Sequence, residues 1–131
     1  MKGRPNNALR IPTSLQGRFF KYWFEFLRPF HNLTDREIDV IASFVKQRYN
    51  LSKVISDPEI LDRETMGEVT KRKVREECNI SLAHFQVIMG KLRKSKVIED
   101  GRINPKFIPN IVEGENNLKL LLYFELKDEL Q

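Results

Sequence analysis

The stretch Thr70–Pro105, TKRKVREECNISLAHFQVIMGKLRKSKVIEDGRINP, decides the expected fold of this chain. Its order predicts a short basic helix, a tight turn at Asn79-Ile80-Ser81, a second helix to about Lys94, and a hairpin. Ser81 is a favourable N-cap for the second helix. The hairpin is expected to turn at Glu99-Asp100-Gly101, because Asp-Gly between short apolar runs is a strong hairpin signal. The segment therefore predicts a helix-turn-helix followed by a hairpin.

The second helix of this motif has one apolar face. Phe85, Ile88, Met89 and Leu92 recur at the i, i+3, i+4, i+7 spacing of a helix side that packs on a core. The first helix carries a similar stripe, made of Val69, Val74 and Cys78. The remaining positions of the second helix are expected to face away from the core.

Positive charge gathers in the same stretch. From residue 70 to 106 there are ten Lys or Arg against four Asp or Glu, whereas the whole chain has a net charge of only +5. The charge regions alternate along the chain: residues 1–50 are basic, 51–69 acidic, 70–106 basic and 107–131 acidic. Such clustering indicates a polyanion or an acidic partner, because solubility alone does not require it.

Residues 70–104 resemble the winged helix-turn-helix domains of MarR-type and replication-initiator proteins. The match is carried by the run from Ser81 to Ile98, in which the four apolar helix residues precede Lys96-Val97-Ile98 at the entry to the wing. Ser95-Lys96 stands where the family pattern has Lys-Gly, so the turn before the wing is expected to be wider. The resemblance covers about a quarter of the chain. It implies that the Ser81–Lys94 helix binds DNA.

If this helix enters the major groove, its N-terminal half reads bases and its basic C-terminal end meets phosphates. Gln86 suits the edge of adenine, and Val87 suits a thymine methyl group. The expected partner is double-stranded DNA. The residues expected to contact it are Ser81, His84, Gln86, Val87, Lys91, Arg93, Lys94, the wing residue Arg102, and Lys71 and Arg72 of the first helix.

The first half of the chain predicts an arm and a helical scaffold. Residues 1–13 have no periodicity and read as a basic arm, which either tracks phosphates or is a frayed terminus. Residues 14–50 predict two helices, one from Ser14 to Arg28 and one capped by Thr34-Asp35-Arg36-Glu37. The second is expected to run to about Tyr49 and to bury Ile38, Ile41, Ala42, Phe44 and Val45.

The helix at 14–28 is expected to end at Pro29 and is apolar on more than one face. Its main stripe, which we expect in the core, comprises Leu15, Phe19, Trp23, Phe26 and Leu27. Phe20, Tyr22 and Phe24 lie off that stripe and are candidates for a subunit interface, where aromatic anchors are enriched.

The remaining segments predict a connector and a second hairpin. Residues 51–69 are an acidic connector in which Pro58 opens a short helix. Residues 105–131 are expected to form a C-terminal hairpin, with strands at Phe107–Val112 and Leu118–Leu126. The second strand, LKLLLYFEL, is too apolar to be solvated on one face along its whole length. Leu121 and Tyr123 are therefore further interface candidates.

The composition argues against several classes of protein. One cysteine and two histidines are too few for a disulfide framework or a Cys/His zinc cluster, and we expect no metal or cofactor. His31 is expected to be a loop residue and Cys78 a small core residue, and there is no Gly-rich phosphate loop, so an enzyme is not expected. No run approaches the length of a membrane span, and we expect a cytoplasmic protein without a membrane partner.

The expected fold class is α+β, mainly helical: a winged helix-turn-helix domain at 14–131 preceded by the arm.

Two functions are consistent with this expected fold. The first is a dimeric DNA-binding regulator or replication factor. The alternative is a structural component of a phage virion, such as a head–tail connector or ring protein, which uses the fold as an oligomeric adaptor among other virion proteins. The size and the basic arm resemble those of small phage-encoded proteins. The apolar residues on the outward helix face and the alternating charge regions favour this alternative, because neighbouring copies can dock basic on acidic.

Overall fold

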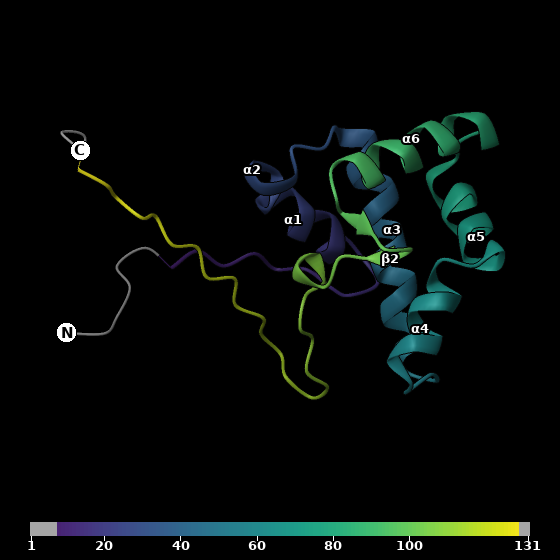
Figure 1. Ribbon diagram of the computed structural model, residues 1–131. Helices are drawn as coiled ribbons and strands as arrows, with labels where there is room; N and C mark the ends of the chain where they lie inside the picture. The colour runs from purple at the N-terminus through teal and green to yellow at the C-terminus, as the bar shows by residue number, and fades with distance from the viewer. Residues whose placement is uncertain (1–7, 129–131) are drawn as a thin grey trace.

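The computed structural model describes residues 8–128 as a mainly helical domain with a small two-stranded antiparallel sheet (Figure 1). The helices within this range are α1 (Phe19–Phe26), α2 (Arg28–His31), α3 (Asp35–Ser52), α4 (Pro58–Thr65), α5 (Glu68–Cys78) and α6 (Leu82–Lys94). They are followed by β1 (Ile98–Glu99), β2 (Arg102–Ile103) and a 3-10 turn η1 (Pro105–Phe107).

Helix α3 lies at the centre of the domain and packs against α1, α4, α5 and α6. Its start follows from the sequence: the Thr34 side chain accepts from the Glu37 amide, and the Glu37 carboxylate accepts from the Thr34 amide, which confirms the capping box. All five residues predicted to be buried on this helix are buried, together with Val40. The helix extends to Ser52, three residues beyond the predicted end.

The aromatic segment departs from its predicted pattern. Helix α1 begins at Phe19 rather than Ser14, and Pro29 lies inside the first turn of α2, where its missing N–H costs nothing. Phe20 and Phe24 point into the core, whereas Phe26 is 46% exposed. The predicted core stripe was therefore wrong at Phe26, because the side that packs on α3 is offset from the most apolar stripe. Leu27 is buried as predicted, and Leu15, Phe19 and Trp23 are partly buried against the core.

The acidic connector is itself part of the packed domain. As predicted, Pro58 opens a short helix, α4, and the Asp57 side chain caps it by accepting from the amides of Glu59 and Ile60. Asp62 of α4 accepts two hydrogen bonds from the Arg48 guanidinium of α3, at 3.3 and 3.2 Å. Each of these two side chains is at most one-fifth exposed, so the pair fastens α4 to the central helix.

Helices α5 and α6, the turn at residues 79–81 and the β1–β2 hairpin follow one another as predicted. Asn79 makes the turn in the left-handed region, at φ 51°, and Ser81 caps α6. In the hairpin, Ile98 pairs with Ile103 and Glu99 with Arg102, so the turn residues are Asp100 and Gly101 alone. Both have positive φ, which is the geometry that Asp-Gly favours in a two-residue turn.

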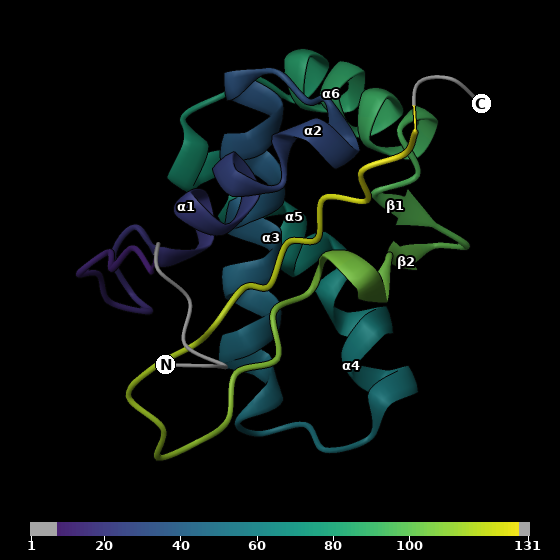
Figure 2. The same ribbon diagram turned by 90° about the vertical axis from the view of Figure 1, so that its left-hand side faces the viewer.

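The C-terminal hairpin is absent from residues 8–128: residues 108–128 contain no strand there, and Phe107 belongs to η1. The prediction was wrong because the apolar segment 118–126 finds no covering surface in this chain. Figure 2 shows it as an extended trace in front of the helices. The predicted arm at 1–13 falls partly outside the described residues, and residues 8–13 form no regular element. The last residues of the predicted hairpin, 129–131, also lie outside them.

One contact joins distant parts of the chain. The indole Nε1 of Trp23, on α1, donates to the carbonyl oxygen of Phe107 at 2.9 Å, across 84 residues. Phe107 is buried and also faces His31, with ring centroids 6.1 Å apart. The end of η1 is thus attached to the N-terminal helices.

Candidate nucleic-acid interface

Helix α6 is held by its inner face and presents the other face to solvent. Phe85, Ile88, Met89 and Leu92 are all at most 3% exposed, as predicted. Burying each side chain of this size stabilises the packing of α6 on the core by about 1.5–3 kcal/mol. The Ser81 hydroxyl accepts from the His84 amide at 3.1 Å, so this predicted DNA contact already has a structural role as the N-cap.

The outward face of α6 has a line of small and apolar positions at its centre. Ala83, Val87 and Gly90 follow one another at four- and three-residue spacing opposite the core face, and the long cation Lys94 follows four residues later on the same side. All four are exposed, and nothing lies within 4 Å of a Cβ built at Gly90. The predicted base-reading residues His84 and Gln86 are exposed on the two flanks of this line. A helix with so little bulk along its outer line is suited to close approach to another surface.

The C-terminal half of α6 is basic and free of carboxylates. Lys91, Arg93, Lys94 and Lys96 are all exposed, and the sequence contains no acidic residue between Glu77 and Glu99. Within residues 8–128 none of these four cations takes part in an ion pair. They also lie in or next to the last turn of the helix, where positive charge interacts favourably with the helix dipole.

The cations predicted on α5 differ from each other. Arg72 is exposed, whereas Lys71 is about one-quarter exposed and lies 3.8 Å from the Glu68 carboxylate of the same helix. Arg75 stacks over Phe85 of α6, with its guanidinium carbon 5.9 Å from the ring centroid. Sequence reasoning did not single out Arg75. This side chain packs on α6 rather than facing solvent, and so helps to fix the position of α6 relative to α5.

The hairpin carries mixed charge. Arg102 is half exposed, and its Nη1 lies 3.7 Å from the Asp62 carboxylate of α4. Glu99 and Asp100, at the turn, are exposed. The hairpin therefore presents one cation, Arg102, which is partly neutralised and lies beside two carboxylates. It is less suited to contact phosphate than α6 is.

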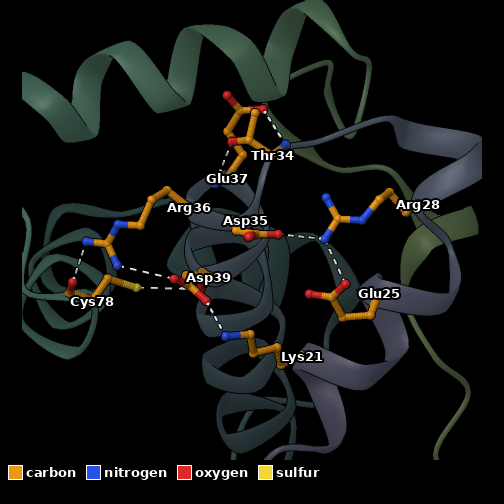
Figure 3. Close-up of polar contacts among 9 residues, drawn as sticks. All are labelled: Lys21, Glu25, Arg28, Thr34, Asp35, Arg36, Glu37, Asp39 and Cys78. Carbon is orange, nitrogen blue, oxygen red and sulfur yellow. Dashed lines mark hydrogen bonds and ion pairs between the residues drawn. The ribbon is translucent and has the colours of Figure 1, made fainter.

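Helix α5 is fastened to the start of α3 by a set of polar contacts (Figure 3). Arg36 donates to the Cys78 carbonyl oxygen at 2.7 Å and pairs with Asp39, which also pairs with Lys21 of α1. Lys46 pairs with Glu77 at 2.9 Å. These contacts fix the last turn of α5 and hence the turn that leads into α6. Two of the contacts that join α3 to α5 link residues 42 positions apart (Arg36 and Cys78) and 31 positions apart (Lys46 and Glu77), which is why the sequence pattern gave no signal for them.

Two of the five predicted interface residues are in the wrong place for that role. Phe20 and Phe24 are at most 2% exposed in the core of their own chain, because α1 packs on α3 through them. Tyr22 is half-buried. Leu121 and Tyr123, in the C-terminal segment, are 70% and 81% exposed and remain available for contact.

The two residues considered for chemistry have structural roles. His31 is buried in α2, not in a loop: its Nδ1 accepts from the Leu33 amide, so the protonated Nε2 donates to the Phe24 carbonyl oxygen. Desolvation by burial lowers the pKa of His31. Burial, with Glu77 and Asp39 nearby, raises the pKa of the Cys78 thiol to about 11, so it is a poor nucleophile near neutral pH.

Three further features of residues 8–128 concern metal ions, membranes and clefts. Among residues 8–128 no group of three or more His, Cys, Asp or Glu side chains is placed to hold a metal ion. No helix in that part of the chain is long and apolar enough to cross a membrane. A cleft of about 310 Å³ opens between α1, α3 and the end of α5, but the Lys21, Arg36 and Lys46 cations that line it are already paired within the domain.

Comparison with protein-family models, curated proteins and solved structures found no match to this chain.

Proposed function

We propose that this protein binds double-stranded DNA through the exposed face of α6, in a winged helix-turn-helix arrangement with β1–β2 as a short wing. The observation that carries the proposal is the basic end of α6: four exposed cations, unpaired within residues 8–128, on a helix whose outer line is small. Phosphate neutralisation supplies most of the non-specific affinity of DNA-binding proteins. The role would be that of a transcription or replication regulator.

The residues divide into two groups under this proposal. Lys91, Arg93 and Lys94 hold the backbone phosphates, because they are long, exposed and clustered at one end of the helix. Gln86, His84 and Val87 lie at the other end, and Gln86 matches the donor and acceptor pattern of adenine. The two groups predict different losses: phosphate contacts set affinity and salt dependence, and base contacts set sequence preference.

The test is a salt titration of binding to labelled duplex DNA, measured by fluorescence anisotropy. Affinity should fall with salt, with a log–log slope of roughly −0.9 per phosphate contacted. Lys91→Ala and Arg93→Ala together should make the slope shallower by about two, and Gln86→Ala should alter sequence preference with little change in slope.

Matched controls come from the opposite end of the domain. Lys53 and Arg63 are exposed cations at the ends of α3 and α4 and carry the same two side-chain types. Lys53→Ala with Arg63→Ala should leave the slope unchanged. A salt-independent affinity, or equal effects of the two pairs, would falsify the assignment of α6.

A second candidate function rests on a different observation. The apolar segment Leu118–Leu126 is exposed over most of its length, as in a subunit that is completed by its neighbours. Under this alternative the protein is an oligomeric adaptor in a virion ring or connector, and the outer line of α6 packs on protein. Light scattering on the purified chain should then reveal a large ring, and DNA affinity should be absent or independent of Gln86.

A further inference from the structure

The C-terminal segment Leu118–Lys127 has the properties of an unpaired β-strand. Within residues 8–128 it forms no backbone hydrogen bond, so its N–H and C=O groups are available along its length. Its exposed side chains are large and apolar: Leu121 is 70% exposed, Tyr123 81%, Phe124 86% and Leu126 93%. Such an edge is a template for pairing with another strand.

The side chains of this segment alternate in a way that defines two faces. In an extended strand, successive residues point to opposite sides. One face is wholly apolar and comprises Leu118, Leu120, Leu122, Phe124 and Leu126. The other comprises Lys119, Leu121, Tyr123, Glu125 and Lys127, so its centre is apolar and charges flank it.

The position of the charges selects one self-pairing register. When two copies run antiparallel and cross at Leu122, Lys119 of each lies opposite Glu125 of the other, on the same face. Leu121 then lies opposite Tyr123, and Leu120 opposite Phe124. Opposite charges and apolar pairs placed directly across two strands stabilise a sheet.

Neighbouring registers that keep the apolar face intact are worse. Crossing at Tyr123 places Lys119 opposite Lys127, and crossing at Leu121 places Glu125 opposite the uncharged Asn117. Registers shifted by a single residue oppose the apolar face of one strand to the charged face of the other.

We propose that residues 118–126 form an antiparallel two-stranded ribbon with the same segment of a second copy, centred on Leu122, and that this ribbon is the dimer contact of the protein. The contact is independent of α6 and does not rest on DNA binding. It explains why so apolar a segment lies uncovered on a single chain.

The test uses charge reversal and sedimentation equilibrium on the full chain. Lys119→Glu alone, and Glu125→Lys alone, each turn both cross-strand ion pairs into like-charge pairs, and each should weaken the dimer about tenfold or more. An equimolar mixture of the two variants restores Glu opposite Lys at both positions. The mixture should therefore form a heterodimer with near wild-type affinity, as should the double variant K119E/E125K with itself.

Matched controls make the same charge changes outside the register. Lys127→Glu faces Asn117 in the proposed ribbon, and Glu113→Lys lies beyond it; both should dimerise like the wild type. A chain that is monomeric throughout the measured range, or variants that fail to rescue each other on mixing, would overturn the proposal. The helical signal in circular dichroism should be the same in each variant and the wild type, because the altered side chains are exposed and lie outside the helices.

Discussion

Replacing Lys96 by glycine should stabilise the protein, because Lys96 occupies a backbone conformation that an L-residue adopts only at a cost. It follows the end of α6 with φ 64°, in the left-handed region, and its amide donates to the Arg93 carbonyl oxygen. The next amide, of Val97, donates to the Leu92 carbonyl oxygen, which closes the helix in the manner of a glycine C-cap.

The magnitude follows from two opposing contributions. The left-handed conformation costs an L-residue about 1–2 kcal/mol, and glycine avoids that cost. Glycine in turn loses about 0.5–1 kcal/mol through the greater freedom of its unfolded chain. The side chain of Lys96 is exposed and in no ion pair within residues 8–128, so little else changes. The net gain should be about 1 kcal/mol, or roughly 3–5 °C in Tm for a domain of this size.

Urea denaturation followed by circular dichroism measures the free energy of unfolding, with two controls. Lys96→Ala removes the same side chain but retains the left-handed strain, and should change stability by less than about 0.5 kcal/mol. Lys94→Gly places glycine in the helical last turn of α6 and should destabilise by about 1 kcal/mol. If Lys96→Gly is no more stable than Lys96→Ala, the reasoning from backbone strain is refuted.

Two further predictions concern His31 and Arg102. The pKa of His31 is lowered by burial from its ordinary value of 6.5, so the unfolded chain takes up a proton before the folded one. The contribution of neutral His31 to the free energy of unfolding is complete above about pH 6.5 and is lost as the pH falls towards the lower pKa of the folded state. The variant His31→Gln should therefore show a smaller decline in the free energy of unfolding between about pH 7 and 5 than the wild type. Because Arg102 lies beside Asp62 and two exposed carboxylates, Arg102→Ala should reduce DNA affinity less than Arg93→Ala in the same anisotropy assay. An Arg102→Ala loss as large as that of Arg93→Ala would show that the hairpin is the stronger phosphate contact.

Local signals in the sequence predicted the parts of the fold that are set by neighbouring residues. The Thr34 capping box, the Ser81 cap and the Asp100-Gly101 turn each depend on hydrogen bonds or φ values within four residues. The buried face of α6 was predictable because Phe85, Ile88, Met89 and Leu92 form a single stripe at helical spacing, and all four are buried.

Tertiary packing decided the parts that the sequence pattern did not predict. In α1 several aromatic stripes compete, and contact with α3 selects Phe20 and Phe24 over Phe26. In α5 Val74 is buried as predicted, but the second buried position is Thr70, whose hydroxyl donates to the Glu64 carbonyl oxygen, while the predicted Val69 is 58% exposed. The prediction of a C-terminal hairpin was wrong for a different reason. Its residues favour a β-strand, but strand propensity alone does not supply a second strand for it to pair with.

Of the candidate site, the sequence predicted the exposed residues of α6 but not the charge balance around them. Exposure of Lys91, Arg93 and Gln86 follows from the helical period once the apolar face is known. The ion pairs that partly neutralise Lys71 and Arg102 depend on Glu68 and on Asp62 of α4. The second of these joins residues 40 positions apart, and no local pattern indicates it.

The single tryptophan gives this protein an intrinsic fluorescent probe of the contact between η1 and α1. Trp23 belongs to the N-terminal helices, yet its indole donates to the backbone at Phe107, the final residue of η1, which is the last element of the domain. Its emission should therefore respond to release of η1 from α1 even while the interior helices stay formed. Comparing that signal with far-ultraviolet circular dichroism during denaturation separates undocking of the chain end from loss of the helical body.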